Sequence, residues 1–325
     1  MDICIRADGG SSIGMGHIMR TLVLARELRK KHNVFYTCKA DDPLTDKYYA
    51  GIDFIAKQGF KVVKIDEKEI IKDLKNIKSD CIITDSYDVD EEYFNALKRI
   101  FRISGCFDDE KICEYYNVDF LINQNAYAFT FDYHVNKDTD LILGNKYTIL
   151  REEFRNIPAP VINKDIKDIM ITVGGSDNTN ITGEIINSLK NSNFNMHVVI
   201  GPSFKHYDEL KKNENERIRF YFNPKMSVLM TKCDIAISSC GSTLYELAAC
   251  GTPTIGIVIV DNQLMAAEYM SKSGSIIYSD INDLLFSIEE LTYEQRKVMS
   301  ISGKKLVDGL GVFRIIDKIE KRLNL

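Results

Sequence analysis

Residues 7–17 read Ala7-Asp8-Gly9-Gly10-Ser11-Ser12-Ile13-Gly14-Met15-Gly16-His17. This glycine-rich segment lies between a short apolar run at residues 3–7 and a helical pattern at residues 17–31. A strand, a loop and a helix in this order are typical of a βαβ unit in a parallel sheet. The glycines allow close approach of a ligand, and the helix start offers N–H groups to an anion. No Gly-Lys-Ser/Thr follows, which excludes a Walker A loop, and the spacing matches a dinucleotide fingerprint poorly.

The same alternation of apolar runs and amphipathic segments continues along all 325 residues. It predicts an α/β protein with two Rossmann-like domains, since both halves begin with a strand, a glycine loop and a helix. The proline cluster Ile157-Pro158-Ala159-Pro160 suits neither a helix nor a central strand, and we place the domain boundary there. We expect domains at residues 1–155 and 156–308, and a helix at residues 309–325 that crosses back to the first domain.

The composition narrows the possible partners and location. Lys and Arg number 42 against 47 Asp and Glu, so the formal net charge is -5, which argues against a nucleic-acid partner. The eight cysteines form no Cys-x-x-Cys pair and the five histidines are scattered, so we expect buried thiols and no zinc site. The chain shows neither a signal-peptide pattern nor a long apolar run, and we expect a cytoplasmic protein without a membrane span.

Two side chains of the first half are candidates for catalysis. His17 stands at the start of the first predicted helix, where a neutral imidazole can accept a proton from water or from a sugar hydroxyl. A capping or core histidine is the alternative. Tyr87 follows the apolar run at residues 81–85, which would put its phenol at the carboxyl edge of the sheet. A core or rim tyrosine remains possible there.

The neighbouring Asp88-Val89-Asp90 has the Asp-x-Asp spacing used by metal-dependent sugar transferases. A helical pattern follows at once, and this favours an acidic N-cap over a metal site.

Two segments of the second half are candidates for nucleotide binding. The amides of Gly174-Gly175-Ser176, before a predicted helix, could hold a diphosphate; an ordinary capped βα turn is the alternative. In Ser238-Ser239-Cys240-Gly241-Ser242-Thr243-Leu244-Tyr245-Glu246, a carboxylate follows a small-residue loop. Glu246 could accept both ribose hydroxyls of a nucleotide, or it could be a surface residue that the helix dipole favours.

Several of these motifs resemble a known family when taken in order. The opening Arg6-Ala7-Asp8 with Ile13-Gly14-Met15-Gly16-His17-Ile18-Met19-Arg20 resembles that of the UDP-sugar hydrolases of pseudaminic acid biosynthesis and of spore-coat polysaccharide biosynthesis proteins. The likeness continues through Ile83-Thr84-Asp85-Ser86-Tyr87, Phe107-Asp108-Asp109, Leu121-Ile122-Asn123-Gln124-Asn125-Ala126-Tyr127, Leu150-Arg151-Glu152-Glu153-Phe154, Gly174-Gly175-Ser176-Asp177, Ser238–Pro253 and Asp261-Asn262-Gln263. It therefore covers nearly the whole chain.

The resemblance implies a glycosyltransferase-B type fold with a central cleft. It also implies hydrolysis of the anomeric C–O bond of UDP-2,4-diacetamido-2,4,6-trideoxy-β-L-altropyranose, with inversion, release of UDP, and no metal or cofactor. The family's catalytic histidine maps onto His17 and a tyrosine that supports the sugar onto Tyr87; we add Asp8 as the carboxylate that orients the imidazole. The expected substrate contacts are Gly14, Gly16, Arg20, Gly174, Gly175, Ser176, Asn180, Ser239, Gly241, Ser242, Thr243, Glu246, Asn262 and Gln263.

Two other functions remain open at this level. A glycosyltransferase of the same fold would use the same base, because water and an acceptor hydroxyl attack in the same way. A non-catalytic protein that binds a sugar nucleotide within a polysaccharide assembly would bind UDP without turnover. The expected partner is a small UDP-sugar, and we expect a monomer because a cleft enzyme needs hinge freedom between its halves.

Overall fold

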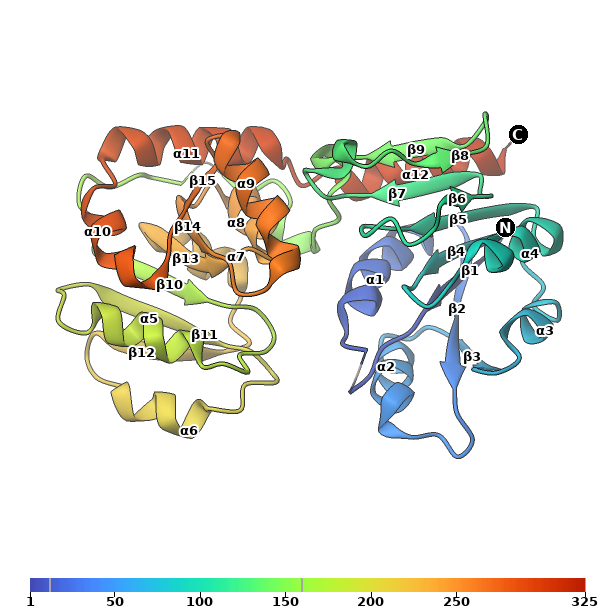
Figure 1. The fold of residues 1–325 in the computed structure, drawn as a ribbon, viewed down its shortest axis with the longest axis horizontal. Coiled ribbons are helices and arrows are strands. Elements are labelled where there is room, and N and C mark those ends of the chain that lie inside the picture. Colours follow the sequence, from blue (N-terminus) through green and yellow to red (C-terminus); the bar gives the residue numbers. More distant parts are fainter. Residues whose placement is uncertain (12, 159, 325) are drawn as a thin grey trace. The chain divides into compact units, whose positions relative to one another are not determined.

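The computed structural model describes residues 1–11, 13–158 and 160–324 and divides into two compact units (Figure 1). The first comprises Met1–Ile149 with the segment that starts at Leu310, and the second is Leu150–Gly309. The expected domain limits were 155/156 and 308/309. Ser12 of the first glycine loop, Ala159 of the expected boundary and Leu325 of the expected last helix lie outside the described residues.

The first unit is built on a parallel seven-stranded sheet in the order β3-β2-β1-β4-β5-β7-β9. Its strands are β1 (Asp2–Ala7), β2 (Asn33–Ala40), β3 (Val62–Asp66), β4 (Cys81–Asp85), β5 (Ile103–Phe107), β7 (Phe120–Asn123) and β9 (Asp140–Leu143). Short strands β6 (Tyr115–Tyr116) and β8 (His134–Val135) pair separately. Because β2 and β4 lie on opposite sides of β1, the strand order reverses between β1 and β4.

Helices cover both faces of this sheet (Figure 1). One apolar core joins the sheet to α1 (Gly16–Leu28), α2 (Asp46–Lys57) and α12 (Gly311–Leu323), and another joins it to α3 (Ile70–Leu74) and α4 (Glu91–Ile100). Buried side chains recur at helical spacing along α12, at Val312, Ile315, Ile319 and Leu323. This face of α12 packs with α1, so the last helix completes the core of the first unit.

The second unit contains a parallel six-stranded sheet in the order β12-β11-β10-β13-β14-β15. Its strands are β10 (Asp168–Thr172), β11 (Asn195–Ile200), β12 (Ile218–Phe222), β13 (Ile235–Ser239), β14 (Thr254–Ile257) and β15 (Ile276–Tyr278). Its helices are α5 (Ile181–Leu189), α6 (Tyr207–Leu210), α7 (Met226–Lys232), α8 (Thr243–Cys250), α9 (Leu264–Lys272), α10 (Leu284–Glu289) and α11 (Tyr293–Leu306). This strand order is that of a Rossmann-type nucleotide-binding sheet, and it reverses between β10 and β13.

The fold confirms the predicted α/β class and the parallel sheets, with some additions. The sequence patterns did not predict β9, the β6–β8 pair, α6 or α10, all of which are too short to show a clear period. All eight cysteines are buried and free, as expected. Within the described part of the chain, no helix combines the length and the apolar character needed to cross a membrane.

Candidate active site

Three loops of the first unit meet where its strand order reverses, the place at which open α/β sheets bind ligands. The loop after β1 leads to His17, β4 ends at Asp85, and Asp109 follows β5. In the sheet Asp85 lies beside Ala7 of β1 and Phe107 of β5. The parallel register therefore brings together residues that are far apart in the sequence.

His17 is oriented by a buried carboxylate that the sequence interpretation did not select. The Nδ1 atom of His17 lies 2.6 Å from Oδ1 of Asp85, whose side chain is fully buried. Burial raises the pKa of Asp85, but the charge and hydrogen bonds of Arg20, with the hydrogen bond from His17, outweigh it and hold the pKa below its usual value. Since Asp85 is ionised, the short contact requires a proton on Nδ1. In the neutral ring Nε2 then carries the lone pair.

Arg20 lies one helical turn beyond His17 on α1 and joins two carboxylates. It donates to Asp85 through Nε and Nη2, both at 2.6 Å, and to Asp109 through Nη1 at 2.7 Å. Although burial lowers the pKa of this guanidinium, the two carboxylates hold the pKa well above the ordinary value. The sequence predicts Arg20 as a substrate contact. In the structure its Nε, Nη1 and Nη2 atoms donate to Asp85 and Asp109 instead.

Tyr87 completes this cluster. Its hydroxyl donates to Oδ1 of Asp109 at 2.7 Å, and its ring meets the ring of His17 edge-on at a centroid distance of 4.7 Å. Partial burial and the charge of Asp109 raise the pKa of the phenol, so it stays protonated at neutral pH. The Tyr87 side chain is 45% exposed, and a ligand can therefore reach it. The structure thus brings Tyr87 and His17 together, two residues that the sequence had identified separately.

Asp109 is held in place by the turn around the preceding residue. The carboxylate of the buried Asp108 accepts backbone N–H groups of Glu110, Lys111 and Ile112 and the hydroxyl of Tyr116. This arrangement fixes the turn that follows β5. The two adjacent aspartates therefore differ in role, because one shapes the loop and the other faces Arg20 and Tyr87.

The expected orienting role of Asp8 is wrong. Its carboxylate accepts from Arg6 Nη2 at 3.2 Å and from the backbone N–H of Lys39 at 2.7 Å, and it pairs with the Lys39 ammonium at 3.7 Å. Asp8 lies directly after β1 and Lys39 near the end of β2, so the carboxylate ties these adjacent strand ends together. Asp85 occupies the position that we had assigned to Asp8.

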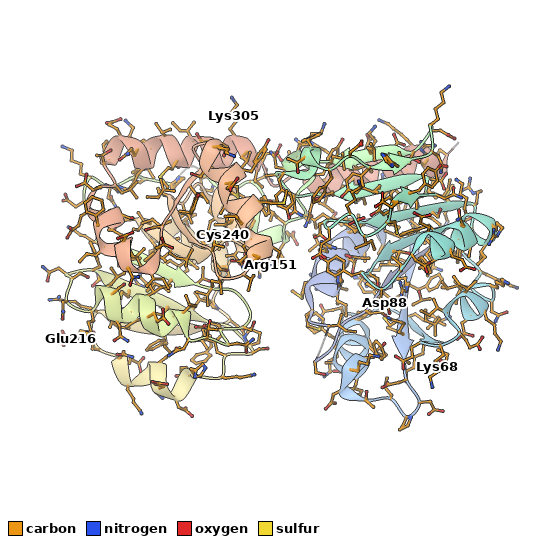
Figure 2. The ribbon with its side chains drawn as sticks, in the orientation of Figure 1. Lys68, Asp88, Arg151, Glu216, Cys240 and Lys305 are labelled. Atoms are coloured by element: carbon orange, nitrogen blue, oxygen red, sulfur yellow. The ribbon has the colours of Figure 1, made fainter. Side chains whose placement is uncertain are left out.

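The Asp88-x-Asp90 motif is also occupied by structural contacts. Asp90 is the N-cap of α4 and accepts the N–H of Tyr93 at 2.8 Å, as the sequence predicted. Asp88, labelled on the first unit in Figure 2, pairs with the buried ammonium of Lys39. In residues 1–11, 13–158 and 160–324, no group of three or more His, Cys, Asp or Glu side chains is arranged to hold a metal ion.

The four glycines of the first loop fall into two pairs. A Cβ at Gly10 would lie 1.9 Å from the backbone oxygen of Lys47, and one at Gly9 would lie 2.4 Å from a side-chain carbon of Ile18. These two glycines allow close packing against α2 and α1. Gly14, with φ 81°, and Gly16 are exposed, and a Cβ at either would meet nothing within 4 Å. Only this second pair has open space for a ligand.

In the second unit the loops after β10 and β13 lie side by side at the reversal of that sheet. A Cβ at Gly174 would lie 3.9 Å from Oγ of Ser239, and one at Gly241 would lie 4.0 Å from the same atom. Gly175 and Ser176 are exposed. The predicted residues Gly174, Gly175, Ser239 and Gly241 are therefore neighbours within one unit. Cys240, labelled in Figure 2, lies between Ser239 and Gly241 in the sequence, and its side chain is buried.

The start of α5 differs from the expectation of open N–H groups. Both carboxylate oxygens of Asp177 accept backbone N–H groups, from Ile181 at 2.8 Å and from Thr182 at 2.9 Å. Asn180 precedes α5 in a left-handed conformation with φ 59°. An anion at this loop would therefore meet the amides of residues 174–176 rather than these two N–H groups.

Glu246 lies in the first turn of α8 beside an arginine. Nη2 and Nε of Arg151 both donate to its Oε1, at 3.1 and 3.3 Å, while Nη1 of Arg151 pairs with Glu153 at 2.7 Å. Burial raises the pKa of Glu246 and the charge of Arg151 partly offsets this increase. Because both hydrogen bonds use Oε1, the geometry leaves Oε2 for another donor, which a ribose hydroxyl could supply.

The remaining predicted contacts surround the same end of the second sheet. Ser242 and Thr243 stand at the start of α8, and Asn262 and Gln263 stand between β14 and α9. Ser242 and Asn262 are exposed, while the Oε1 atom of Gln263 accepts the N–H of Ile259 at 3.0 Å. Gln263 therefore shapes its own loop.

Comparison with known proteins adds sequence relatives. Residues 169–301 match the glycosyltransferase family 28 C-terminal domain. An uncharacterized protein of Methanocaldococcus jannaschii is 32% identical over the whole chain, which spans 67% of that protein's length. The Campylobacter jejuni UDP-2,4-diacetamido-2,4,6-trideoxy-β-L-altropyranose hydrolase is 29% identical over 84% of this chain and 97% of its own. The Bacillus subtilis spore coat polysaccharide biosynthesis protein SpsG is 24% identical, and the match covers 97% of this chain and 96% of SpsG.

Solved structures support the same architecture. The crystal structure of Acinetobacter baumannii MurG matches with a TM-score of 0.67 at 14% identity, over 98% of this chain and 99% of that chain. At this identity the likeness concerns the fold alone, which is of the glycosyltransferase-B type.

Proposed function

Because the chain belongs to the family of the UDP-2,4-diacetamido-2,4,6-trideoxy-β-L-altropyranose hydrolases and spore coat polysaccharide biosynthesis proteins, we propose that it hydrolyses a UDP-linked diacetamido-trideoxy sugar. The bond broken is the anomeric C–O bond, and the products are UDP and the free sugar. The observation that carries this proposal is the contact between Nδ1 of His17 and Asp85. It fixes the orientation of the ring and leaves Nε2 as the atom that can accept a proton.

In the proposed reaction a water molecule attacks the anomeric carbon. Its oxygen forms the new C–O bond while the bond to the UDP oxygen breaks, and the electron pair leaves with UDP. Nε2 of His17 takes the proton of the water, and the ionised Asp85 stabilises the imidazolium that forms. UDP is a good leaving group, so the step needs one base rather than two carboxylates. Attack opposite UDP would invert the anomeric centre.

Tyr87 is proposed to contact the sugar. Its hydroxyl proton is donated to Asp109, so the phenol oxygen can accept a hydrogen bond from an N–H or O–H group of the substrate. The raised pKa of Tyr87 argues against a phenolate at neutral pH. We therefore assign it a binding role and not the role of a base.

The second unit is proposed to bind UDP. The amides of residues 174–176, with Ser239, Gly241, Ser242 and Thr243 across the reversal of the sheet, supply donors suited to a diphosphate. Oε2 of Glu246 is suited to accept ribose hydroxyls. We propose Gly14, Gly16 and Asn262 as further contacts, because all three are exposed.

A glycosyltransferase is the second candidate, and the match to the glycosyltransferase family 28 C-terminal domain favours it. The deciding experiment incubates the protein with the UDP-sugar without an acceptor and follows UDP. Release that His17→Ala abolishes supports the hydrolase. Release only after a sugar or lipid acceptor is added would support a transferase, and tight UDP binding without any release would support a binding protein.

A further inference from the structure

We propose that Arg20 is a positioning residue that fixes both His17 and Tyr87, and that it is not a ligand of the substrate diphosphate. The inference rests on the proposed function, because it assigns Arg20 a part in the same reaction. It starts from an unbroken series of contacts that runs from the base to the tyrosine: His17 to Asp85, Asp85 to Arg20, Arg20 to Asp109, and Asp109 to Tyr87.

The donors of Arg20 are directed at protein atoms. Nε and Nη2 hold Asp85 in a two-point contact, Nη1 holds Asp109, and the guanidinium lies 5.2 Å from the ring centroid of Phe107. The side chain is 15% exposed. Three of its five N–H donors are engaged by carboxylates and little of the side chain is exposed, so a diphosphate would find few donors of Arg20 to contact.

The effect on His17 comes mainly through Asp85, although Nη2 of Arg20 also lies 3.3 Å from Nδ1 of His17. Oδ1 of Asp85 meets both Nδ1 of His17 and Nη2 of Arg20, while Oδ2 meets Nε of Arg20. A carboxylate held at both oxygens cannot rotate away from the imidazole. Arg20 also keeps this buried group ionised, and an ionised acceptor keeps the proton of His17 on Nδ1.

The effect on Tyr87 comes through Asp109. Arg20 binds Oδ2 of Asp109 and leaves Oδ1 to accept the phenol proton. The hydroxyl direction of Tyr87 is thereby set by the same cation that sets the tautomer of His17. One guanidinium lies between two carboxylates, so its loss would leave Asp85, beside the imidazole, and Asp109, beside the phenol, without this cation.

The kinetic test compares Arg20→Lys and Arg20→Gln with the full-length wild-type chain. We expect kcat for UDP release to fall by about 10²-fold, the low end of the range for a displaced general base, while the Kd of UDP stays unchanged. The pH profile of kcat/KM should also shift, because the groups facing the imidazole change. A weaker affinity for UDP with an unchanged kcat would overturn the proposal and make Arg20 a diphosphate ligand.

A spectroscopic test does not depend on turnover. In 15N-histidine-labelled protein, the His17 signals, identified by their loss in His17→Gln, should show a protonated Nδ1 and an unprotonated Nε2 in the neutral ring. Arg20→Lys should give a mixture of the two neutral tautomers. Unchanged ring signals would contradict the positioning role. If the wild type releases no UDP, the proposed hydrolysis fails, while this test still decides the role of Arg20.

Two further variants separate positioning from misfolding. Asp109→Asn leaves the contact between Arg20 and Asp85 in place, and it should weaken sugar binding, seen as a higher KM, with little change in the His17 spectrum. Arg322→Lys removes an equally short contact, from Nε to Asp140, within the same unit and should leave kcat, KM and the spectrum unchanged. A His17 spectrum as disturbed in either variant as in Arg20→Lys would refute the specific role of Arg20.

Discussion

Asp85 is the residue on which the proposed chemistry of His17 most depends. It is fully buried at the end of β4, and three N–H donors from Arg20 and His17 surround it. Two of these donors belong to the cationic Arg20, which keeps the buried carboxylate ionised, and the carboxylate gives the imidazole a fixed direction. The same arrangement makes Asp85 a sensitive position for substitution.

Replacement of Asp85 by Asn should separate binding from catalysis. The amide can still touch Nδ1, but it cannot stabilise an imidazolium, so kcat for UDP release should fall by about 10²- to 10⁴-fold. Affinity for UDP should stay close to that of the wild type, because the proposed nucleotide site lies in the other unit. Steady-state kinetics and calorimetric titration of UDP check both values. A variant with normal kcat would show that Asp85 is only structural.

The depressed pKa of Asp85 also predicts a pH dependence of stability. The folded protein binds this proton less tightly than the unfolded chain does, so the contribution of Asp85 is complete above the ordinary pKa of 3.8. It is lost as the pH falls through the lower pKa of the folded state. Asp85→Asn should therefore be less stable than wild type at neutral pH, by about 3 kcal/mol.

Urea unfolding of both proteins across this pH range gives the measurement. The difference in unfolding free energy between wild type and Asp85→Asn should shrink as the solution becomes more acidic than pH 3.8. A difference that stays constant with pH would mean that Asp85 is not ionised in the folded protein.

The sequence revealed only part of this cluster. His17 and Tyr87 stand beside recognisable signals, a glycine loop and the end of an apolar run. Asp85 ends the same apolar run, but nothing local pairs Asp85 or Asp109 with Arg20, which lies 65 and 89 residues away from them along the chain. Asp8 lies in the same glycine loop as His17, but its carboxylate accepts from Arg6 and Lys39 instead. Adjacent parallel strands determine these pairings, and a single sequence does not give the strand order.

Secondary-structure elements were predicted more completely than side-chain contacts. The limits of β4 agree with the apolar run at residues 81–85, and α1 differs from the helical pattern at residues 17–31 only at its ends. Strand β9 was missed because Asp140–Leu143 is short and half-exposed, which hides the pattern of a buried strand. Long periodic elements are determined locally, whereas short edge elements depend on their neighbours.

The glycine loop before α1 predicts a contrast between two alanine substitutions. Gly10→Ala would place a Cβ 1.9 Å from the Lys47 carbonyl oxygen and should lower the unfolding free energy by about 1–3 kcal/mol. Gly16→Ala meets no neighbour, so its stability should stay near that of the wild type while its activity falls if substrate approaches this backbone. Urea unfolding of both variants measures the change in stability, and the rate of UDP release measures the change in activity. Full activity in Gly16→Ala would remove Gly16 from the site.

Glu246, at the start of α8, predicts how the ribose of the proposed nucleotide is recognised. If Oε2 of Glu246 accepts ribose hydroxyls, Glu246→Gln should weaken the affinity for UDP roughly tenfold. It should also reduce the preference for UDP over 2′-deoxy-UDP. Arg151→Gln should reduce the same preference, because Arg151 holds Glu246 through Oε1. Titration calorimetry with both nucleotides measures the ratio. Glu289→Gln, on the exposed surface of α10, is the matched control. An unchanged ratio in Glu246→Gln would contradict the ribose assignment.

At the scale of the whole molecule, each unit repeats the same design with different chemistry. Both sheets are parallel and reverse their strand order beside the first strand, the position at which open α/β sheets commonly bind ligands. The first unit places titratable side chains at that edge, and the second places glycine and serine loops there. This difference supports a division in which one unit performs proton transfer and the other binds the nucleotide.

Hydrogen exchange on the full chain tests this division. UDP alone should protect amides in peptides that cover residues 173–182 and 238–247, because ligand contacts slow local opening. Peptides that cover residues 8–20 should change less. Protection confined to the first unit would reverse the assignment of the nucleotide site.

The most direct test of the central claim uses UDP-2,4-diacetamido-2,4,6-trideoxy-β-L-altropyranose in water enriched in 18O, with no acceptor present. Mass spectrometry then locates the heavy oxygen in the products, for the wild type and for His17→Ala. The account predicts that wild type releases UDP, that the 18O appears in the sugar, and that His17→Ala loses the activity. Heavy oxygen in the phosphate of UDP, or undiminished release by His17→Ala, would contradict attack by a water molecule that His17 activates at the anomeric carbon.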